Sequence, residues 1–371
     1  MIPSDEEKVL IDAFRKCGIG MARVHALDHA CTGYTVDGGY VTGLSVADHQ
    51  LHYLPDAVSR LVRLNRLFIL NTGLKVVPRW LGSLCSLRHL RLDGNALRSL
   101  PCPIGLLRDL QYLSARANRI SSISDKLGNC RGLRYLDLQD NRLALLPAAI
   151  CRLSSLQLLN CARNRLQALP GCIVKLAELR ELRVFDNYLR ALPLHIGRLD
   201  ALEYLHADCN HLVSLPNSLT KAKSLRILRV GRNRLQQLPC DIGCARQLLW
   251  IDVGDNIITR LPDSIGRLPV LRELYLRDNR LTRLPESLGA LTQLRVLNVT
   301  GNPLTFLPRA VARLKGLSSL SASYCELTHL PAFLTHQPSL RYVDVRFNSA
   351  LGSSSPHIIG ILRDSGCTVD W

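Results

Sequence analysis

A pattern of 23 residues recurs fourteen times in this chain of 371 residues, with no insertion or deletion between copies. The clearest copy reads LRELYLRDNRLTRLP over residues 271–285. Its asparagine position falls at residues 49, 72, 95, 118, 141, 164, 187, 210, 233, 256, 279, 302, 325 and 348. A fixed period of this length predicts a solenoid, in which each copy packs only on its neighbours and all copies share one core.

Each copy contains the signals of a strand, a tight turn and a return segment. In the LxxLxL part, alternation places Leu274 and Leu276 in the core and turns Glu273, Tyr275 and Arg277 outward, as in a strand. After the asparagine turn, the proline of LxxLP keeps the return segment from pairing as a strand. The PxxIGxL run that follows the proline, as in residues 262–268, predicts a short helical or 3-10 turn.

The asparagine column is predicted to be structural. A buried amide can donate to and accept from backbone groups that the turn leaves unpaired. Asparagine fills the position in eleven copies, and His49, Thr72 and Cys325 are the departures. We therefore expect a ladder of stacked amides inside the solenoid rather than a ligand site.

The run LPxxIGxLxxLxxLxLxxNxLxxLP, clearest across residues 238–308, resembles the 23-residue repeats of typical intracellular leucine-rich repeat proteins. These include the Ras-suppressor and Shoc-2-like proteins and the plant intracellular Ras-group-related proteins. The resemblance covers residues 41–350 and implies a curved α/β horseshoe, with a parallel sheet on the concave side and short helical or 3-10 turns on the convex side. It also implies protein–protein recognition in signalling or complex assembly, and it does not identify the partner.

The two ends of the chain read as caps, which a solenoid needs to cover its terminal core layers. In the N-terminal cap, residues 1–40, Ser4 and Glu7 form a capping box ahead of an apolar helical stripe, and residues 34–39 read as a turn-rich lead into the first strand. The repeats occupy residues 41–350. In the C-terminal cap, residues 351–371, we expect a helix at 357–363 and a final strand at 367–371, with Trp371 either over the last core layer or in a docking tail.

The composition describes an aliphatic, basic protein. Hydrophobic residues make up 47% of the chain, and the net charge of +17 comes mainly from arginine. Either a solvated surface or an acidic partner accounts for that charge. The thirteen scattered cysteines are typical of a reduced protein that uses cysteine as a small apolar filler. With no signal peptide and no membrane span in the sequence, we expect a cytoplasmic protein, with a nuclear or cytoskeleton-associated location as the alternatives.

The sequence lacks the constellations of an enzyme. Its eleven histidines show no HExxH arrangement, and no phosphate-binding glycine loop occurs. The sequence therefore predicts a protein that is not an enzyme and that has no metal or other cofactor.

Two sets of side chains are the candidates for partner binding. The first set lies on the concave face, at outward strand positions that are rich in aromatic residues: Tyr112, Tyr135, Arg183, Tyr204, Arg229, Trp250, Tyr275 and Tyr342. Tyrosine, tryptophan and arginine are favoured at protein hot spots, although neighbouring aromatic side chains on a sheet also pack on one another. The second set follows the asparagine and forms a basic rim: Arg119, Arg142, Arg165, Arg234 and Arg280. These arginines could bind an acidic partner, or they could simply be solvated side chains of the surface.

The function predicted from these observations is a monomeric scaffold or adaptor that binds a partner protein on the concave face. The alternative is a basic component of a polyanionic or nucleic-acid-containing assembly that is held through its arginine rows. Carboxylates in the same face, among them Asp208 and Asp252, make a nucleic acid the weaker candidate.

Overall fold

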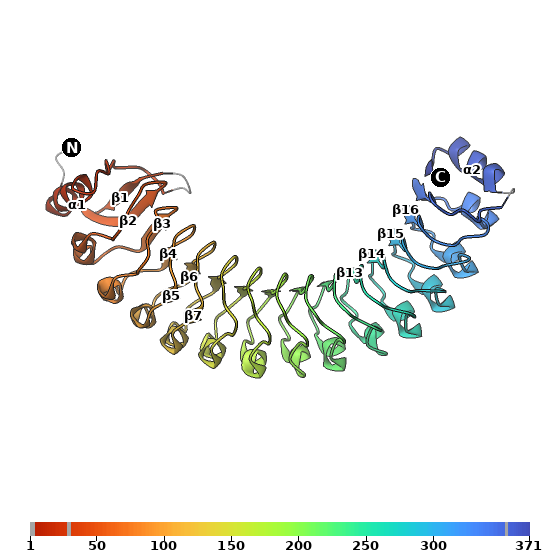
Figure 1. Cartoon of the computed structure of the whole chain (residues 1–371), viewed down its shortest axis with the longest axis horizontal. Coiled ribbons are helices and arrows are strands. Elements are labelled where there is room, and N and C mark those ends of the chain that lie inside the picture. Colours follow the sequence, from red (N-terminus) through yellow and green to blue (C-terminus); the bar gives the residue numbers. More distant parts are fainter. Residues whose placement is uncertain (1–3, 28–30, 353–354) are drawn as a thin grey trace. The chain divides into compact units, whose positions relative to one another are not determined.

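The computed structural model describes residues 4–27, 31–352 and 355–371. Residues 1–3 and 28–30 of the expected N-terminal cap, and residues 353–354 of the expected C-terminal cap, lie outside the described residues. The chain divides into two compact units, Met1–Asn187 (unit 1) and Tyr188–Trp371 (unit 2). In each unit the strands line one face and short 3-10 helices line the opposite face (Figure 1). This is the leucine-rich repeat solenoid that the sequence predicts.

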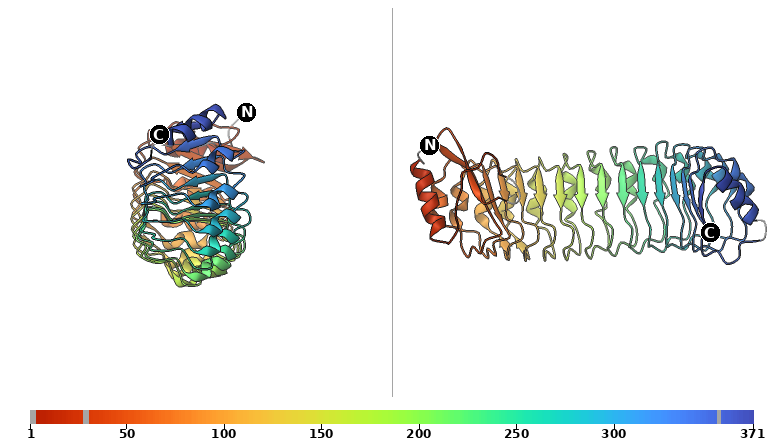
Figure 2. Two further views of the ribbon diagram at one scale, coloured as in Figure 1. Left: turned by 90° about the vertical axis from the view of Figure 1, so that its right-hand side faces the viewer. Right: turned by 90° about the horizontal axis from the view of Figure 1, so that it is seen from above.

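The strands of unit 1 stand side by side in chain order, as Figure 2 shows. Its main sheet contains β1 Gly33–Asp37, β2 Tyr40–Ala47, β3 Arg66–Leu70, β4 His89–Arg91, β6 Tyr112–Ser114, β8 Tyr135–Asp137, β9 Leu158–Asn160 and β10 Glu181–Arg183. Its 3-10 helices are η1 Asp56–Arg60, η2 Arg79–Ser83, η3 Cys102–Leu106, η4 Asp125–Asn129, η5 Ala148–Arg152 and η6 Gly171–Lys175. From β2 onward the pairing is parallel, and every pair joins residues 23 apart, as Leu113 and Leu136 are.

Unit 2 repeats the same parallel arrangement with paired residues 23 apart, except in its last pair of strands, where the partners Tyr342 and Thr368 are 26 apart. Its strands are β11 Tyr204–His206, β12 Ile227–Arg229, β13 Trp250–Asp252, β14 Glu273–Tyr275, β15 Val296–Asn298, β16 Ser319–Ser321, β17 Tyr342–Asp344 and β18 Thr368–Asp370. Its 3-10 helices are η7 Ile196–Arg198, η8 Asn217–Lys221, η9 Ile242–Cys244, η10 Asp263–Arg267, η11 Glu286–Ala290, η12 Arg309–Arg313 and η13 Ala332–His336. The expected alternation is confirmed: Leu274 and Leu276 are fully buried, whereas Glu273, Tyr275 and Arg277 are partly exposed.

The return segments depart from expectation at one place. In unit 1, β5 Ser99–Leu100 pairs in parallel with β7 Ser122–Ile123. Proline was expected to prevent such pairing, but the residue after Ile123 is Ser124, which donates its backbone N–H to the Leu100 carbonyl (3.1 Å). Ser124 stands at the proline position of the repeat, and a proline has no N–H to make that bond. The serine therefore allows the short ladder between the two return segments to form.

The asparagine ladder is confirmed. The side chain of Asn118 accepts the backbone N–H of Leu97 (3.0 Å) in the preceding repeat and donates to the carbonyls of Leu92 (2.8 Å), Ala115 and Arg116 (both 3.1 Å). Asn256 makes the same four contacts in unit 2. One amide therefore satisfies backbone groups of two successive repeats.

Cys325 shows what the ladder loses without the amide. Its thiol lies 3.4 Å from the Val299 carbonyl and 3.5 Å from that of Ser323, but it offers no strong acceptor to the preceding repeat. The N–H of Leu304, which the amide oxygen would otherwise take, instead donates to the Asn302 carbonyl at 2.7 Å.

The residue before each ladder position has a left-handed backbone, a feature that the sequence analysis missed. All fourteen of these residues, from Asp48 to Phe347, have φ between 50° and 70°. Glycine, asparagine and aspartate tolerate this region, but alanine, arginine and aromatic residues are strained in it. The turn that places the amide in the core therefore requires a left-handed backbone at the preceding residue, whichever side chain that residue has.

The N-terminal helix α1 Asp5–Arg15 has the predicted capping box, in which the Ser4 hydroxyl accepts the Glu7 N–H and the Glu7 carboxylate accepts the Ser4 N–H. The helix contacts β2 and η1. The expected turn-rich lead at residues 34–39 is wrong, because β1 forms an antiparallel hairpin with β2. Gly38 and Gly39, both with positive φ, make its two-residue turn.

At the other end, α2 Ser355–Asp364 and β18 confirm the expected helix and final strand. Val369 points into the core, and Ile359 and Leu362 of α2 are buried. Trp371 was expected to cover the last core layer, but it is 55% exposed. It follows the last paired residue of β18, so the strand does not direct its side chain inward.

The cysteines correct a second expectation. Cys151 of η5 and Cys172 of η6 form a disulfide between adjacent repeats of unit 1, with Cα atoms 5.8 Å apart. The scattered cysteines had predicted reduced thiols throughout. Cys161, which is fully buried, does serve as apolar filler.

Replacing Asn256 with alanine is expected to destabilise the protein by more than about 2 kcal/mol, because buried backbone groups lose their partners. Cys325→Asn makes the opposite change and should stabilise by about 1 kcal/mol by restoring the acceptor for Leu304. Urea unfolding followed by circular dichroism measures both. Equal stability of the Asn256→Ala variant and the parent would contradict the structural role of the ladder.

Ala117→Gly should stabilise the protein by about 1 kcal/mol, because glycine relieves the strain of the left-handed backbone (φ 53°). The matched control is Ala168→Gly, also exposed but without a positive φ, which should be neutral or destabilising by about 0.5 kcal/mol. The midpoints of urea denaturation separate the two variants, and a loss of stability in both would refute the strain.

Candidate partner-binding surface

The outward side chains of the strands form one continuous surface in each unit, here called the sheet face. Strand geometry turns the first and third residues of each three-residue strand outward, while the middle leucine, isoleucine or valine enters the core. The parallel register then aligns equivalent residues into rows, so that Tyr204, Ile227 and Trp250 are direct neighbours across strands. The sequence-predicted candidates of the concave face all lie on the sheet face.

In unit 1 these candidates contact one another or a neighbouring carboxylate. The rings of Tyr112 and Tyr135 stack with centroids 4.3 Å apart and planes 6° apart. Arg183 donates from Nε to the Glu181 carboxylate at 2.6 Å. The side-by-side packing that the sequence left open as an alternative is therefore present here, and this part of the surface is already internally paired.

In unit 2, two of the candidates form a tilted aromatic pair. Trp250 is partly exposed, and its indole ring lies 4.9 Å from the ring of Tyr275, with the planes tilted by 31°. The Tyr275 hydroxyl donates to the Glu273 carboxylate at 2.7 Å, which fixes the ring in place. Tyr342 lies farther along the chain, on β17, and its hydroxyl donates to Asp370 at 2.9 Å. We call Trp250 and Tyr275 the aromatic step.

A carboxylate network lies beside the aromatic step. Asp208 accepts the Gly231 N–H at 2.9 Å and contacts Nε of Arg229 at 3.3 Å. Burial, opposed by Arg229 and assisted by the nearby Asp252, raises the pKa of Asp208 to about 6. Arg229, predicted as a partner-binding cation, is thus engaged within the protein.

The arginines of the basic rim, unlike those of the sheet face, are not paired with carboxylates within the described part of the chain. Arg119, Arg142 and Arg165 in unit 1, and Arg234 and Arg280 in unit 2, are all exposed. Each donates its backbone N–H to the preceding repeat, which holds the row in register. Among the described residues, no carboxylate lies within ion-pair distance of these five guanidinium groups.

An exposed aromatic pair escaped the sequence analysis. Tyr324 and Phe347 are 60% and 63% exposed, and their rings stack at 4.2 Å. Both occupy the left-handed position before the ladder residue, where glycine or aspartate would be less strained. The position before the ladder residue requires a positive φ, which is unfavourable for an aromatic side chain. A sequence comparison of that position across the repeats could therefore have identified both residues.

The described residues offer no sign of a metal centre. They contain no group of three or more histidine, cysteine, aspartate or glutamate side chains that could hold a metal ion. No helix in the described part of the chain combines the length and the apolar character needed to cross a membrane.

Comparison with known families identifies the repeats in two segments. A model described as a leucine-rich repeat region matches residues 123–210, and a leucine rich repeat model matches residues 246–304. A search of curated protein sequences finds no match.

Solved structures share the fold over most of this chain. It is similar to a leucine-rich repeat protein of Leptospira interrogans, with 29% identity and a TM-score of 0.82, over 87% of this chain and 82% of the other. The ectodomain of the Arabidopsis thaliana receptor kinase GASSHO1/SCHENGEN3 gives 23% identity and a TM-score of 0.70, over 91% of this chain but only 42% of its own length. The functional domain of InlJ from Listeria monocytogenes has 21% identity and a TM-score of 0.70, over 84% of this chain and 63% of its own length.

The raised pKa of Asp208 predicts a specific pH dependence of stability. The folded pKa of about 6 exceeds the ordinary aspartate value of 3.8, so the folded state binds more protons between about pH 4 and pH 6. Stability should therefore fall as the pH rises through this window, by about 3 kcal/mol at most from this residue. Asp208→Asn should flatten that fall in urea unfolding measured at several pH values.

The control for this experiment is Asp241→Asn, which changes an exposed carboxyl at the start of η9. It should leave the pH profile of the parent intact. An Asp208→Asn profile as steep as that of the parent would show that Asp208 does not titrate in this window.

Proposed function

We propose that this protein is a non-enzymatic scaffold or adaptor that binds a partner protein on the sheet face of unit 2, centred on the aromatic step. The observation that carries the proposal is a partly exposed Trp250 held against Tyr275, whose own ring is fixed by Glu273. Fixed aromatic side chains contribute large contact areas at little entropic cost, and tryptophan and tyrosine are enriched at protein hot spots.

The electrostatics beside the step favour a protein partner over a polyanion. Asp208, Asp252 and Glu273 lie on the same face, and their carboxylates would repel a phosphate backbone. The mixture of an aromatic centre with paired charges around it is the composition of a protein interface.

Solved proteins of this fold support the same class of function. The Arabidopsis ectodomain is in complex with Casparian strip integrity factor 2, and the plant receptor RGFR1 is in complex with RGF2. For the present protein we infer from these complexes only that the fold offers a surface for binding a protein or peptide. A role in intracellular signalling or complex assembly, a cytoplasmic location and a monomeric state belong to this proposal.

Trp250→Ala should weaken capture of the partner at least tenfold, because loss of a central aromatic anchor costs about 2 kcal/mol or more. The purified protein is immobilised, incubated with native lysate at low and high salt, and the retained proteins are quantified. The effect should persist at high salt, since burial of apolar surface is not screened. Trp80→Ala is the matched control, because Trp80 lies on η2, where its Nε1 donates to Asp56 at 2.7 Å.

A second candidate function rests on the unpaired guanidinium groups of the basic rim. If the rim holds a polyanion, nucleic acid should be retained at low salt, released at high salt and unaffected by Trp250→Ala. Arg234→Glu with Arg280→Glu should then reduce retention. That combination of results would refute the protein scaffold and support the alternative.

A further inference from the structure

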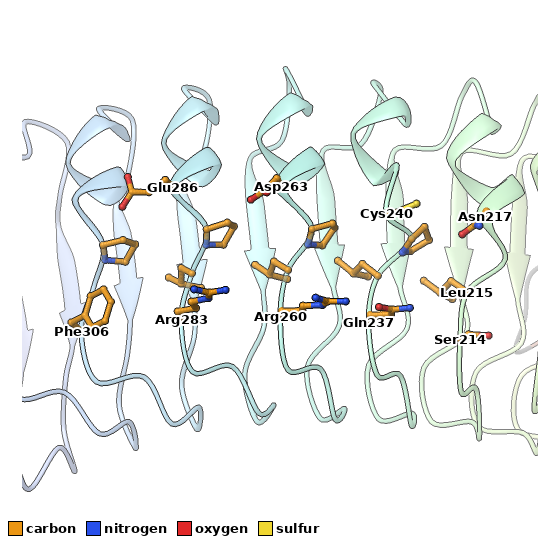
Figure 3. Close-up of a pocket in the computed structure, with 17 residues that line it drawn as sticks. Ser214, Leu215, Asn217, Gln237, Cys240, Arg260, Asp263, Arg283, Glu286 and Phe306 are labelled. Atoms are coloured by element: carbon orange, nitrogen blue, oxygen red, sulfur yellow. The ribbon is translucent and has the colours of Figure 1, made fainter.

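A groove with a volume of about 940 Å³ crosses successive repeats of unit 2 (Figure 3). It is formed by the segments that lead from each asparagine turn into the following 3-10 helix, so it lies apart from the strands of the sheet face. The floor consists of Leu238, Leu261 and Leu284, which are nearly completely buried, and of the prolines that follow them. We call it the Leu-Pro groove.

The two walls of the Leu-Pro groove carry opposite charges. Two successive repeats contain the sequences Arg-Leu-Pro-Asp, residues 260–263, and Arg-Leu-Pro-Glu, residues 283–286. Figure 3 shows Arg260 and Arg283 on one side of the prolines and Asp263 and Glu286 on the other. The extended backbone at Pro262 (φ −71°, ψ 145°) and Pro285 (φ −72°, ψ 148°) carries the chain across the floor and separates the two walls.

These charges remain available to a ligand. All four side chains belong to exposed residues. Within the described residues, Arg260, Arg283 and Asp263 have no ion pair, and only Glu286 has one, with exposed Arg313 at 3.3 Å. An exposed pair of this kind is weak and exchanges readily with solvent.

The charge pattern is confined to this part of the groove. At the position of Arg260 the preceding repeat has Gln237, and the following repeat after Arg283 has Phe306. Phe306 is 46% exposed and lines the same groove, so an apolar contact lies at one end of the charged segment.

We propose that the Leu-Pro groove binds an extended segment of a partner protein in which acidic and basic residues alternate. Successive side chains of an extended chain point to opposite sides. Acidic side chains can therefore face Arg260 and Arg283 while the intervening basic side chains face Asp263 and Glu286. The backbone and the aliphatic stems of the peptide lie on the leucine and proline floor, and a terminal apolar residue packs on Phe306.

The opposite walls distinguish this ligand from a polyanion. A nucleic acid strand would gain from the two guanidinium groups but would be repelled by Asp263 and Glu286. A segment with alternating charges satisfies both walls at once. This site is separate from the aromatic step, so its test does not depend on Trp250.

The probe is a fluorescein-labelled decapeptide of sequence LEKEKEKEKL, and its binding to the full chain is followed by fluorescence anisotropy at low salt. The matched control is the peptide LEEEEKKKKL, which has the same composition and net charge but carries its charges in two blocks. We expect the alternating peptide to bind at least fivefold more tightly. Arg260→Glu with Arg283→Glu should weaken its binding about tenfold, since two ion pairs of about 0.2–1 kcal/mol are lost and replaced by repulsion.

Two further variants complete the design. Arg246→Glu with Arg267→Glu makes the same charge change at exposed positions outside the groove and should bind the peptide as the parent does. A fourfold variant, Arg260→Glu, Asp263→Arg, Arg283→Glu and Glu286→Arg, exchanges the two walls. It should recover the binding lost in the double variant, because an alternating peptide can turn over, and that recovery also excludes a folding defect.

Three results would overturn the proposal: equal affinity for the block peptide, undiminished binding by Arg260→Glu with Arg283→Glu, or no recovery in the fourfold variant. A ten-residue oligothymidylate that binds more tightly than the alternating peptide, and that the double variant loses, would also overturn it and assign the groove to a polyanion.

Discussion

The buried asparagine amide is the interaction on which the rest of each repeat depends. At Asn118 and at Asn256, one side chain accepts a backbone N–H of the preceding repeat and donates to carbonyls of that repeat and of its own. Among the described residues, the Leu97 N–H has no backbone acceptor, so without the amide oxygen of Asn118 it would be buried and unsatisfied. Because the contacts join residues 21 and 26 positions apart, an insertion or deletion in any repeat would break them. The constant period of 23 residues follows from that requirement.

The same turn decides what the surface shows. Bringing the amide into the core requires a left-handed residue just before it, and that residue projects its side chain outward. In most repeats the position holds a residue that tolerates the conformation, but Tyr324 and Phe347 carry exposed aromatic rings there. At these two positions a strained backbone and an exposed ring therefore occur together. The ladder fixes the backbone of the turn, so the backbone keeps its conformation whichever side chain it carries.

Charge is distributed unevenly despite the net value of +17. On the sheet face, carboxylates engage the arginines: Asp208 contacts Arg229, and Glu181 contacts Arg183. The aromatic step thus stands in an environment that is close to neutral and partly desolvated, which suits apolar contact. The unpaired guanidinium groups lie elsewhere, on the basic rim and along the Leu-Pro groove. The two kinds of recognition, apolar and electrostatic, are consequently placed on different surfaces of the repeats.

The sequence by itself determined the repeat architecture, the strand alternation, the amide ladder and the row of partly exposed aromatic residues, because each follows from a period of 23 and from alternation within a strand. It misplaced what depends on contacts between repeats or at chain ends. The hairpin of β1 and β2, the disulfide of Cys151 and Cys172, and the exposure of Trp371 are decided by which residues the fold brings together. Likewise, only the tertiary structure separates an engaged arginine such as Arg229 from an available one such as Arg260, since that difference is a distance to a carboxylate in three dimensions, which no linear pattern encodes.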